Sequence, residues 1–239
     1  AQQKNTLSTM TEQTDIMMER SISLSEDITK ELNQCLTANG KTFSDLNDNP
    51  QLIMDLEAAL YPSLKSALDV KYCSGVFVVL DATVNTKTEY ADTSRMGIYL
   101  RLSDLKAVNT SKQHVVFFRG NADIARAEQV QLHNRWNLEF DTSALSGYEQ
   151  IMQFDGNRLV ESCLWTDRLE LSDTWEDVQL LYVPVLDSTG KVRGLCGMEM
   201  SNLYFRLSFP FVEGSCGNIV TVLAPMDKKG NFFLDKAMF

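Results

Sequence analysis

The stretch EDVQLLYVPVLDSTGKVRGLCGMEMS, residues 176–201, decides the fold of this chain. Two runs rich in Val, Leu and Tyr flank Asp187, Ser188, Thr189 and Gly190, which favour a tight turn because glycine readily adopts a positive φ. In the second run, an apolar face alternates with a face that carries selected polar groups. The stretch therefore predicts a β-hairpin, and the polar face of its second strand ends in Glu199.

Composition limits the function. With 239 residues and 44% hydrophobic residues, the chain can build the core of one large or two small domains. A net charge of -10, a pI of about 4.7 and no basic stripe argue against a nucleic-acid surface. No apolar run approaches the roughly 18 to 20 residues of a membrane span, and AQQKNTLSTM lacks a signal-peptide core. We expect a soluble region, either natively or because spans flank it.

Groupings typical of metal sites and catalysis are missing from the sequence. The five cysteines, including Cys216, show no CxxC spacing, which leaves open one disulfide and favours inert core thiols for Cys73, Cys163 and Cys196. The only histidines, His114 and His133, have no Cys or acid at metal-ligand spacing. There is no nucleophile motif or phosphate loop either. We expect no metal, no cofactor, no catalytic residue and no enzyme activity.

Two helices open the chain. Residues 2–39 lack Pro and Gly and carry apolar residues at helical spacing, which predicts one long helix that Gly40 ends. Its apolar stripe is thin, so the N-terminal half is expected to project as a frayed end or to pair with a second copy of the chain. A second, core-packing helix is expected to begin near Pro50, with Asn49 or Asp48 as its cap.

Strand patterns follow the helices. Residues 74–84 are dense in β-branched and aromatic residues, and residues 96–102 alternate strictly between apolar and other side chains. Residues 159–171 predict a third strand that leads into a loop before the hairpin. Residues 113–119 are too brief to assign, and Asn121 can cap a short helix. Residues 217–239 suggest strand, turn and strand, which either join the main sheet or open a second domain. The order predicts an α+β domain with an antiparallel sheet and helices largely on one face.

This order of elements resembles the PAS-like extracytoplasmic sensor modules called Cache domains. The hairpin at 182–201 carries the resemblance through its PV pair, its Asp-x-x-Gly turn and its G-x-x-G-x-acid strand, and Trp165 and Asp167 precede it at about the family's distance. The tail suggests the double-Cache arrangement. The resemblance implies a signalling or dimerisation helix at 1–39, a membrane-distal ligand-binding domain at 40–205, and a connector with the first hairpin of a membrane-proximal module at 206–239.

The resemblance also implies a function. It suggests the ectodomain of a bacterial transmembrane receptor, anchored by helices before Ala1 and beyond Phe239, that binds an amino acid, organic acid or amine. Its helix would pass the signal to a cytoplasmic output such as a histidine kinase, diguanylate cyclase, chemoreceptor or DNA-binding module. The expected partners are a small ligand and a second copy of the chain through the N-terminal helix, with no nucleic acid.

Sheet geometry proposes the ligand site. Tyr99 and Arg101 share the non-aliphatic face of a strand, which predicts a pocket wall, with a solvent-facing sheet surface as the alternative. Arg101 could hold a carboxylate through two hydrogen bonds, and an acid could receive a ligand amine. Arg119 could reach the site or pair with an acid. The candidate ligand-binding residues are Tyr99, Arg101, Trp136, Trp165, Asp167, Tyr182 and Glu199, with core packing as the alternative for Trp136 and Tyr182.

Two other functions stay open at this point. One is a non-sensing structural ectodomain that dimerises through its first helix and fills its pocket with its own side chains. The other is a cytoplasmic PAS or GAF regulatory module that binds a cofactor.

Overall fold

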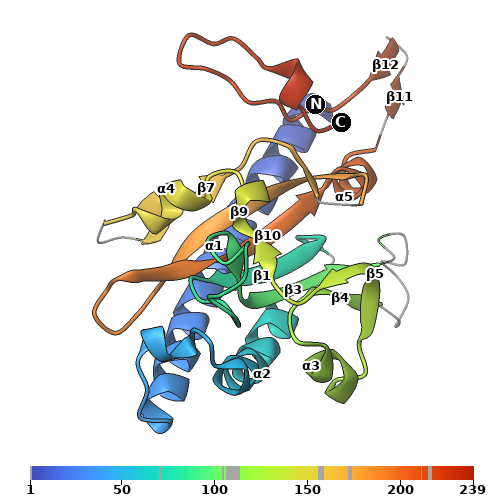
Figure 1. The fold of residues 1–239 in the computed structure, drawn as a ribbon. Helices are drawn as coiled ribbons and strands as arrows, with labels where there is room; N and C mark the ends of the chain where they lie inside the picture. The colour runs from blue at the N-terminus through green and yellow to red at the C-terminus, as the bar shows by residue number, and fades with distance from the viewer. Residues whose placement is uncertain are drawn as a thin grey trace.

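The structure, a computed structural model, describes residues 2–69, 71–103, 105, 114–155, 159–171, 174–210, 212–214 and 217–239. A long N-terminal helix precedes a mixed eight-stranded sheet that is flanked by further helices (Figure 1). The strands of this sheet lie in the order β5-β4-β3-β1-β10-β9-β7, and β8 also pairs with β9. The predicted α+β class is therefore confirmed.

The two leading helices form as predicted. Helix α1 (Gln2–Ala38) ends before Gly40, whose φ is 61°. Helix α2 (Pro50–Ala67) is capped by the Asn49 side chain, which accepts the Leu52 backbone amide at 3.1 Å. The remaining helices are α3 (Ala122–Ala127), which Asn121 caps, α4 (Tyr148–Met152), α5 (Asn202–Ser208) and the 3-10 turns η1 (Phe43–Leu46), η2 (Thr142–Ala144), η3 (Leu159–Ser162) and η4 (Leu234–Lys236).

The predicted hairpin is the longest pair of strands, β9 (Glu176–Leu186) and β10 (Val192–Ser201). The other strands of the main sheet are β1 (Gly75–Leu80), β3 (Gly97–Leu102), β4 (Val115–Arg119), β5 (Gln131–Asn137), β7 (Leu164–Trp165) and β8 (Leu169–Leu171). Two small two-stranded sheets are formed by β2 (Ser94–Arg95) with β6 (Phe140–Asp141), and by β11 (Val212–Gly214) with β12 (Gly217–Ile219).

Three strand expectations need correction. Residues 115–119, which had no assignment, form β4, and β5 pairs with it in parallel, so the sheet is not purely antiparallel. Residues 159–171 do not form one strand, because the Ser162 hydroxyl bonds back to the Leu159 carbonyl at 2.5 Å and closes a 3-10 turn. Within this segment the short strands β7 and β8 pair with β9.

The two faces of the sheet carry separate apolar cores. On the α1 face, helices α1 and α2 cover alternate residues of the central strands, including Val76, Val78, Ile98, Leu100, Leu181, Val183, Cys196 and Met198. On the opposite face, here called the α4 face, α4 covers a smaller and more aromatic cluster that includes Phe77, Tyr99, Phe118, Phe140, Tyr148 and Tyr182. The alternation of side chains along the hairpin therefore divides them between two faces of the sheet, and both faces are buried.

Helix α1 is attached to the α1 face along most of its length. The expectation that its N-terminal half buries little holds for residues 7–9, which are exposed, but Met17 is fully buried. Farther along, Ser25 donates to the Pro184 carbonyl at 2.6 Å, Thr29 accepts the Leu186 amide at 3.3 Å, and Asn33 accepts the Ser188 amide at 3.0 Å. These three contacts, here called the α1–β9 rungs, fix the helix against the hairpin.

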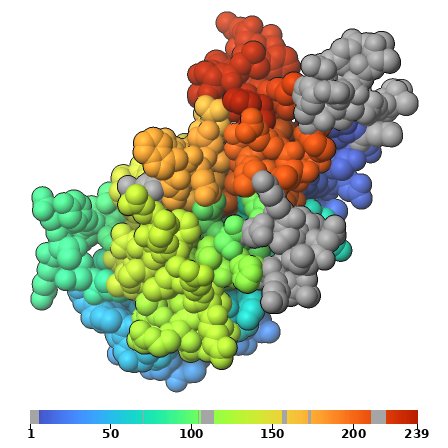
Figure 2. All heavy atoms as spheres, turned by 90° about the vertical axis from the view of Figure 1, so that its right-hand side faces the viewer, coloured from blue at the N-terminus to red at the C-terminus, as the bar shows by residue number. Residues whose placement is uncertain are grey.

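The C-terminal segment, residues 220–239, folds back onto the domain. It does not extend the main sheet: Leu223 bridges Met238, Met226 bridges Phe232, and Gly230 closes the predicted turn on Asp227. Met238 is fully buried in the α1-face core. Arg168 adds hydrogen bonds of 3.0 Å to the carbonyls of Asp235 and Ala237. Figure 2 shows this segment in red at the top of the molecule, against the orange part of the chain.

Two further sequence features can be placed. Cys35, Cys73, Cys163 and Cys196 are unpaired, with Cys73 and Cys196 buried in the α1-face core, whereas Cys216 lies outside the described residues. None of the helices in the described ranges combines the length and the apolar composition that a membrane crossing needs.

Candidate functional site

A buried ion pair crosses the α4 face. Arg101 lies on β3 and Glu199 on β10, and the strand between them, β1, places Gly75 opposite both. Arg101 donates from Nε to Glu199 Oε2 at 2.7 Å and from Nη2 to Oε1 at 3.0 Å. A Cβ at position 75 would lie 3.0 Å from Glu199 Oε2, so the missing side chain gives the pair the space to span β1.

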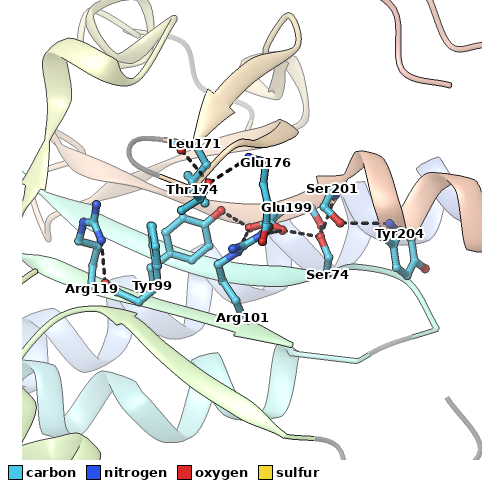
Figure 3. A network of polar contacts seen from close by, with 11 residues as sticks. Ser74, Tyr99, Arg101, Arg119, Leu171, Thr174, Glu176, Glu199, Ser201 and Tyr204 are labelled. Atoms are coloured by element: carbon cyan, nitrogen blue, oxygen red, sulfur yellow. Dashed lines mark hydrogen bonds and ion pairs between the residues drawn. The ribbon is translucent and has the colours of Figure 1, made fainter. Parts of the chain in front are cut away.

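Three more side chains complete this network, as Figure 3 shows. The Tyr99 hydroxyl donates to Glu199 Oε2, the Ser74 hydroxyl donates to Oε1 at 2.6 Å, and Glu176 accepts a second bond from Arg101 Nη2. Glu199 is fully buried and Arg101 is 5% exposed. The solvent-facing alternative for Arg101 is therefore wrong, and its guanidinium is already engaged by two carboxylates of the protein itself.

The pair is held in its charged form. Burial alone would raise the pKa of Glu199, but the Arg101 charge and the hydrogen bonds from Arg101, Ser74 and Tyr99 lower it below its ordinary value. Burial would lower the pKa of Arg101, and the attraction of Glu199 outweighs that effect and raises it. Burial and the adjacent Glu199 charge raise the pKa of Tyr99 well above its usual range, so its hydroxyl stays a donor.

The same network continues to helix α1. The Ser74 hydroxyl accepts the Ser201 backbone amide at 2.8 Å, and the Ser201 hydroxyl accepts the Tyr204 amide at 3.1 Å, because Ser201 caps α5 (Figure 3). The Tyr204 hydroxyl in turn accepts a bond of 2.8 Å from the Gln13 side chain on α1. Polar contacts that are linked through the residues Ser201 and Tyr204 therefore join the α4 face of the sheet to the N-terminal helix.

A pocket of about 200 Å³ lies beside the network on the α4 face. We call it the α4-face pocket. Its floor comes from β3 and β4, and its walls come from β8 and from the segment that follows β5. It is lined by Tyr99, Phe118, Arg119, Asn137, Glu139, Phe140, Asp141, Ala144, Leu145, Leu169, Glu170 and Leu171. Tyr99 thus belongs both to the lining of the pocket and, through its hydroxyl, to the buried network.

The lining of this pocket carries an excess of negative charge, with three carboxylates against one guanidinium. The Arg119 guanidinium lies 4.0 Å from the centre of the Phe118 ring and donates to the backbone carbonyls of Phe118 and Arg135. Glu139 accepts the Val84 amide at 2.8 Å together with two hydroxyls. Among the described residues, the Glu170 carboxylate has no hydrogen bond or ion pair.

The structure divides the predicted site residues into separate groups. Tyr99, Arg101 and Glu199 lie together on the α4 face, as expected. Tyr182 lies on the same face but packs edge-on against Phe77, 5.8 Å between ring centres, and does not line the pocket. Trp136 donates to the Gly120 carbonyl at 2.9 Å and packs against the α1-face core, which supports the packing alternative.

Trp165 and Asp167 lie elsewhere. They line a second pocket of about 260 Å³ on the α1 face, here called the tail pocket, which is bounded by Thr14, Trp165, Thr166, Asp167, Gln179, Met200, Leu223, Ala224 and Pro225. Asp167 forms an ion pair of 2.6 Å with Lys236 of the C-terminal segment. The pairing of Trp165 with Leu181 on β9 explains the placement, because Leu181 faces α1. The prediction that these two residues share a site with Arg101 is therefore wrong.

Several lining residues of the α4-face pocket were not predicted. Phe118, Glu139, Asp141 and Glu170 lie on short strands or in connections whose weak alternation does not show which way a side chain points. The acidic and aromatic residues that cluster at 137–141 could have indicated that this segment lines a pocket.

Comparison with known proteins adds little to this geometry. No protein-family model matches the chain, and no curated protein sequence does. Among solved structures, it is similar to the periplasmic sensory domain of the Campylobacter jejuni chemoreceptor Tlp1, with 13% sequence identity and a TM-score of 0.44. The match covers 83% of this chain and 59% of that one, so the chain spans less than two thirds of that structure. A likeness at this level identifies neither a family nor a ligand.

Proposed function

We propose that this chain is the extracytoplasmic sensing region of a bacterial membrane receptor, of the Cache type, and that it binds a small cationic metabolite in the α4-face pocket. The observation that carries the proposal is the position of Tyr99. Tyr99 lines the pocket, and its hydroxyl begins the linked polar contacts that end at Gln13 on α1. A ligand that moves Tyr99 would therefore act on the element expected to pass the signal on.

The charge of the pocket selects the ligand class. The three carboxylates of Glu139, Asp141 and Glu170 outnumber the single guanidinium of Arg119. The electrostatic potential of this lining therefore favours binding of a cation over binding of an anion. The rings of Tyr99 and Phe140 add aromatic surface beside which an ammonium group can lie, whereas the Phe118 ring is already covered by the Arg119 guanidinium. Glu170 lies on β8 at the edge of the pocket, but its exposed side chain alternates with those of Leu169 and Leu171, which pack on the α4 face, so its charge acts on a ligand only over a longer distance. An amine fits these features, whereas the carboxylate ligand expected for Arg101 does not, because Glu199 and Glu176 occupy that guanidinium.

Ligand binding would shift an equilibrium between two positions of α1 relative to the sheet. Glu199 is the shared member of these polar contacts, because Tyr99, Arg101 and Ser74 all donate to it. Movement of Tyr99 toward a ligand would alter the hydrogen bonding of Glu199, and Ser74 would pass this change to Ser201 and α5. Tyr204→Phe removes the last contact to Gln13 without touching the pocket, so it separates binding from transmission.

Thermal unfolding with a panel of amines and matched carboxylates tests the proposal. A ligand at 100 times its dissociation constant adds about 2.7 kcal/mol to the stability, so at least one amine is expected to raise the melting temperature. Glu139→Gln is expected to weaken that amine at least tenfold, and Tyr204→Phe is expected to leave its affinity unchanged. A panel in which carboxylates alone stabilise the protein, or in which Glu139→Gln has no effect, contradicts the assignment.

One observation favours a second function, a non-sensing structural ectodomain. Arg101, the group expected to recognise a ligand, is neutralised by Glu199 and Glu176 of the same chain. A broad metabolite panel without any stabilising compound would decide for this alternative.

The dimer and the domain division are part of the proposal. Leu7 on the first turns of α1 is 67% exposed, which suits a helix pair between two copies of the chain. Leu7→Glu is expected to lower the mass measured by light scattering, and Thr9→Glu, which is also exposed but lies on the opposite face of α1, serves as the charge-matched control. We divide the chain into 1–39, 40–205 and 206–239, with the last segment as the connector to a membrane-proximal module.

A further inference from the structure

The tail pocket lies where three distant parts of the chain meet. Thr14 comes from α1, Trp165, Thr166 and Asp167 come from β7 and the residues after it, and Leu223, Ala224 and Pro225 come from the C-terminal segment. Gln179 and Met200, which face each other across β9 and β10, form the floor. The α4-face pocket is on the other side of the sheet, so the two pockets share no residue.

Gln179 marks the tail pocket as a site for a hydrogen-bond donor. Its side chain is 5% exposed, and its Oε1 atom is buried without a hydrogen-bond partner among the described residues. Buried amide carbonyls are nearly always bonded, because losing hydration without replacement is unfavourable. A bound molecule with an O–H or N–H group would supply the missing donor.

The other lining groups determine the rest of the ligand. Trp165, Met200, Leu223, Ala224 and Pro225 present apolar surface to the pocket. The two threonine hydroxyls are engaged, since Thr14 donates to the Met10 carbonyl at 2.8 Å and Thr166 accepts the Leu180 amide at 2.9 Å. The only charged lining residue, Asp167, is paired with Lys236. The pocket therefore offers an apolar wall and one acceptor, without an uncompensated charge.

We propose that the tail pocket binds a small, uncharged, largely apolar molecule with one O–H or N–H donor, such as a simple phenol, and that Gln179 Oε1 accepts that donor. The bound molecule contacts α1, the sheet and the C-terminal segment at once. It therefore holds residues 223–225 against the domain, at a site distinct from the proposed amine pocket.

Calorimetric titration with phenol and with toluene, which has nearly the same shape without the hydroxyl, tests the donor requirement. Phenol is expected to bind at least tenfold more tightly than toluene, because a site built around a polar group discriminates against a ligand that leaves it unpaired. In Gln179→Leu this preference is expected to fall to about twofold or less, with a melting temperature at or above that of the parent protein. Equal binding of the two probes, or a preference that survives Gln179→Leu, overturns the proposal.

Two further variants locate the binding. Ala224→Phe fills the pocket from the C-terminal segment and is expected to abolish phenol binding, and this result decides the question if Gln179→Leu does not fold. Unchanged binding in Ala224→Phe would place the phenol elsewhere and overturn the assignment. Glu139→Gln, in the α4-face pocket, is expected to leave phenol binding unchanged, so this proposal and the amine proposal fail independently.

Discussion

Arg101 and Glu199 form an ion pair although their strands are not neighbours: the pair passes over Gly75 of β1, with Arg101 Nε 2.7 Å from Glu199 Oε2. This pair ties three strands of the sheet together on a face without α1. Each partner is buried and stays charged because the other is present, so the loss of one partner is expected to destabilise the fold.

Arg101→Ala is expected to destabilise the protein by about 3–5 kcal/mol, because it leaves the carboxylate of Glu199 buried without its cation. The double variant Arg101→Met/Glu199→Leu removes both charges and is expected to recover a large part of that loss. Urea unfolding of the two variants measures the difference. An Arg101→Ala protein as stable as the parent would mean that Glu199 does not need this partner.

Gly197→Ala is expected to cost more than about 3 kcal/mol, because the added Cβ would lie 1.6 Å from the Leu181 carbonyl oxygen on β9 and force the hairpin strands apart. Gly190→Ala in the turn of the same hairpin is the matched control. Gly190 has a φ of 79° and open space around it, so the expected cost is about 1 kcal/mol. Similar melting temperatures for the two variants would contradict the close approach of β9 and β10.

Glu57 predicts a pH dependence of stability. Its carboxylate is buried on α2 and accepts the backbone amides of Gly97 at 3.2 Å and Asn121 at 2.9 Å. Burial raises its pKa from 4.5 to about 8, and the two amides and the repulsion of Glu139 are smaller effects. Between these two values the folded protein binds more protons than the unfolded chain. Stability should therefore fall as pH rises through this window, by up to about 1.4 kcal/mol per pH unit.

Glu57→Gln tests this expectation, because glutamine does not titrate. Unfolding free energies from pH 5 to 8.5 should show a steeper decline for the parent protein than for the variant. Parallel curves would show that Glu57 keeps an ordinary pKa in the folded protein.

The α1–β9 rungs predict a local effect. Ser25→Ala leaves the Pro184 carbonyl without its donor in a buried position and is expected to cost about 1 kcal/mol. Thr11→Ala removes a similar hydroxyl on the exposed part of α1, where it bonds only to the Leu7 carbonyl, and is expected to change the stability by less than about 0.5 kcal/mol. Equal losses of unfolding free energy in the two variants would argue against close packing of α1 on β9 at Ser25.

Strong local signals made much of the fold predictable. The glycine turn with its flanking apolar runs defined β9 and β10, and the uninterrupted helical spacing before Gly40 defined α1. Strand β5 was missed because its seven residues lie at the sheet edge and are mostly exposed, so they show no apolar alternation.

The site was less predictable, because it depends on register. The alternation of β3 placed Tyr99 and Arg101 on one face correctly, but it could not show that Glu199 meets Arg101 across Gly75. Trp165 was assigned to the same site, and a shift of one position along β9 would have placed it there. Its partner is Leu181 rather than Tyr182, so it faces α1.

The α1–β9 rungs restrict how α1 can move. Successive rungs are four residues apart on the helix and two apart along the hairpin, and between Pro184 and Leu186 on β9 these spacings correspond to rises of about 6 Å and about 6.6 Å. The two repeats are nearly commensurate, so an axial slip of α1 would lengthen all three hydrogen bonds together. Intermediate positions have no compensating contacts, so the movement of α1 relative to the sheet that we propose has to break the three hydrogen bonds together.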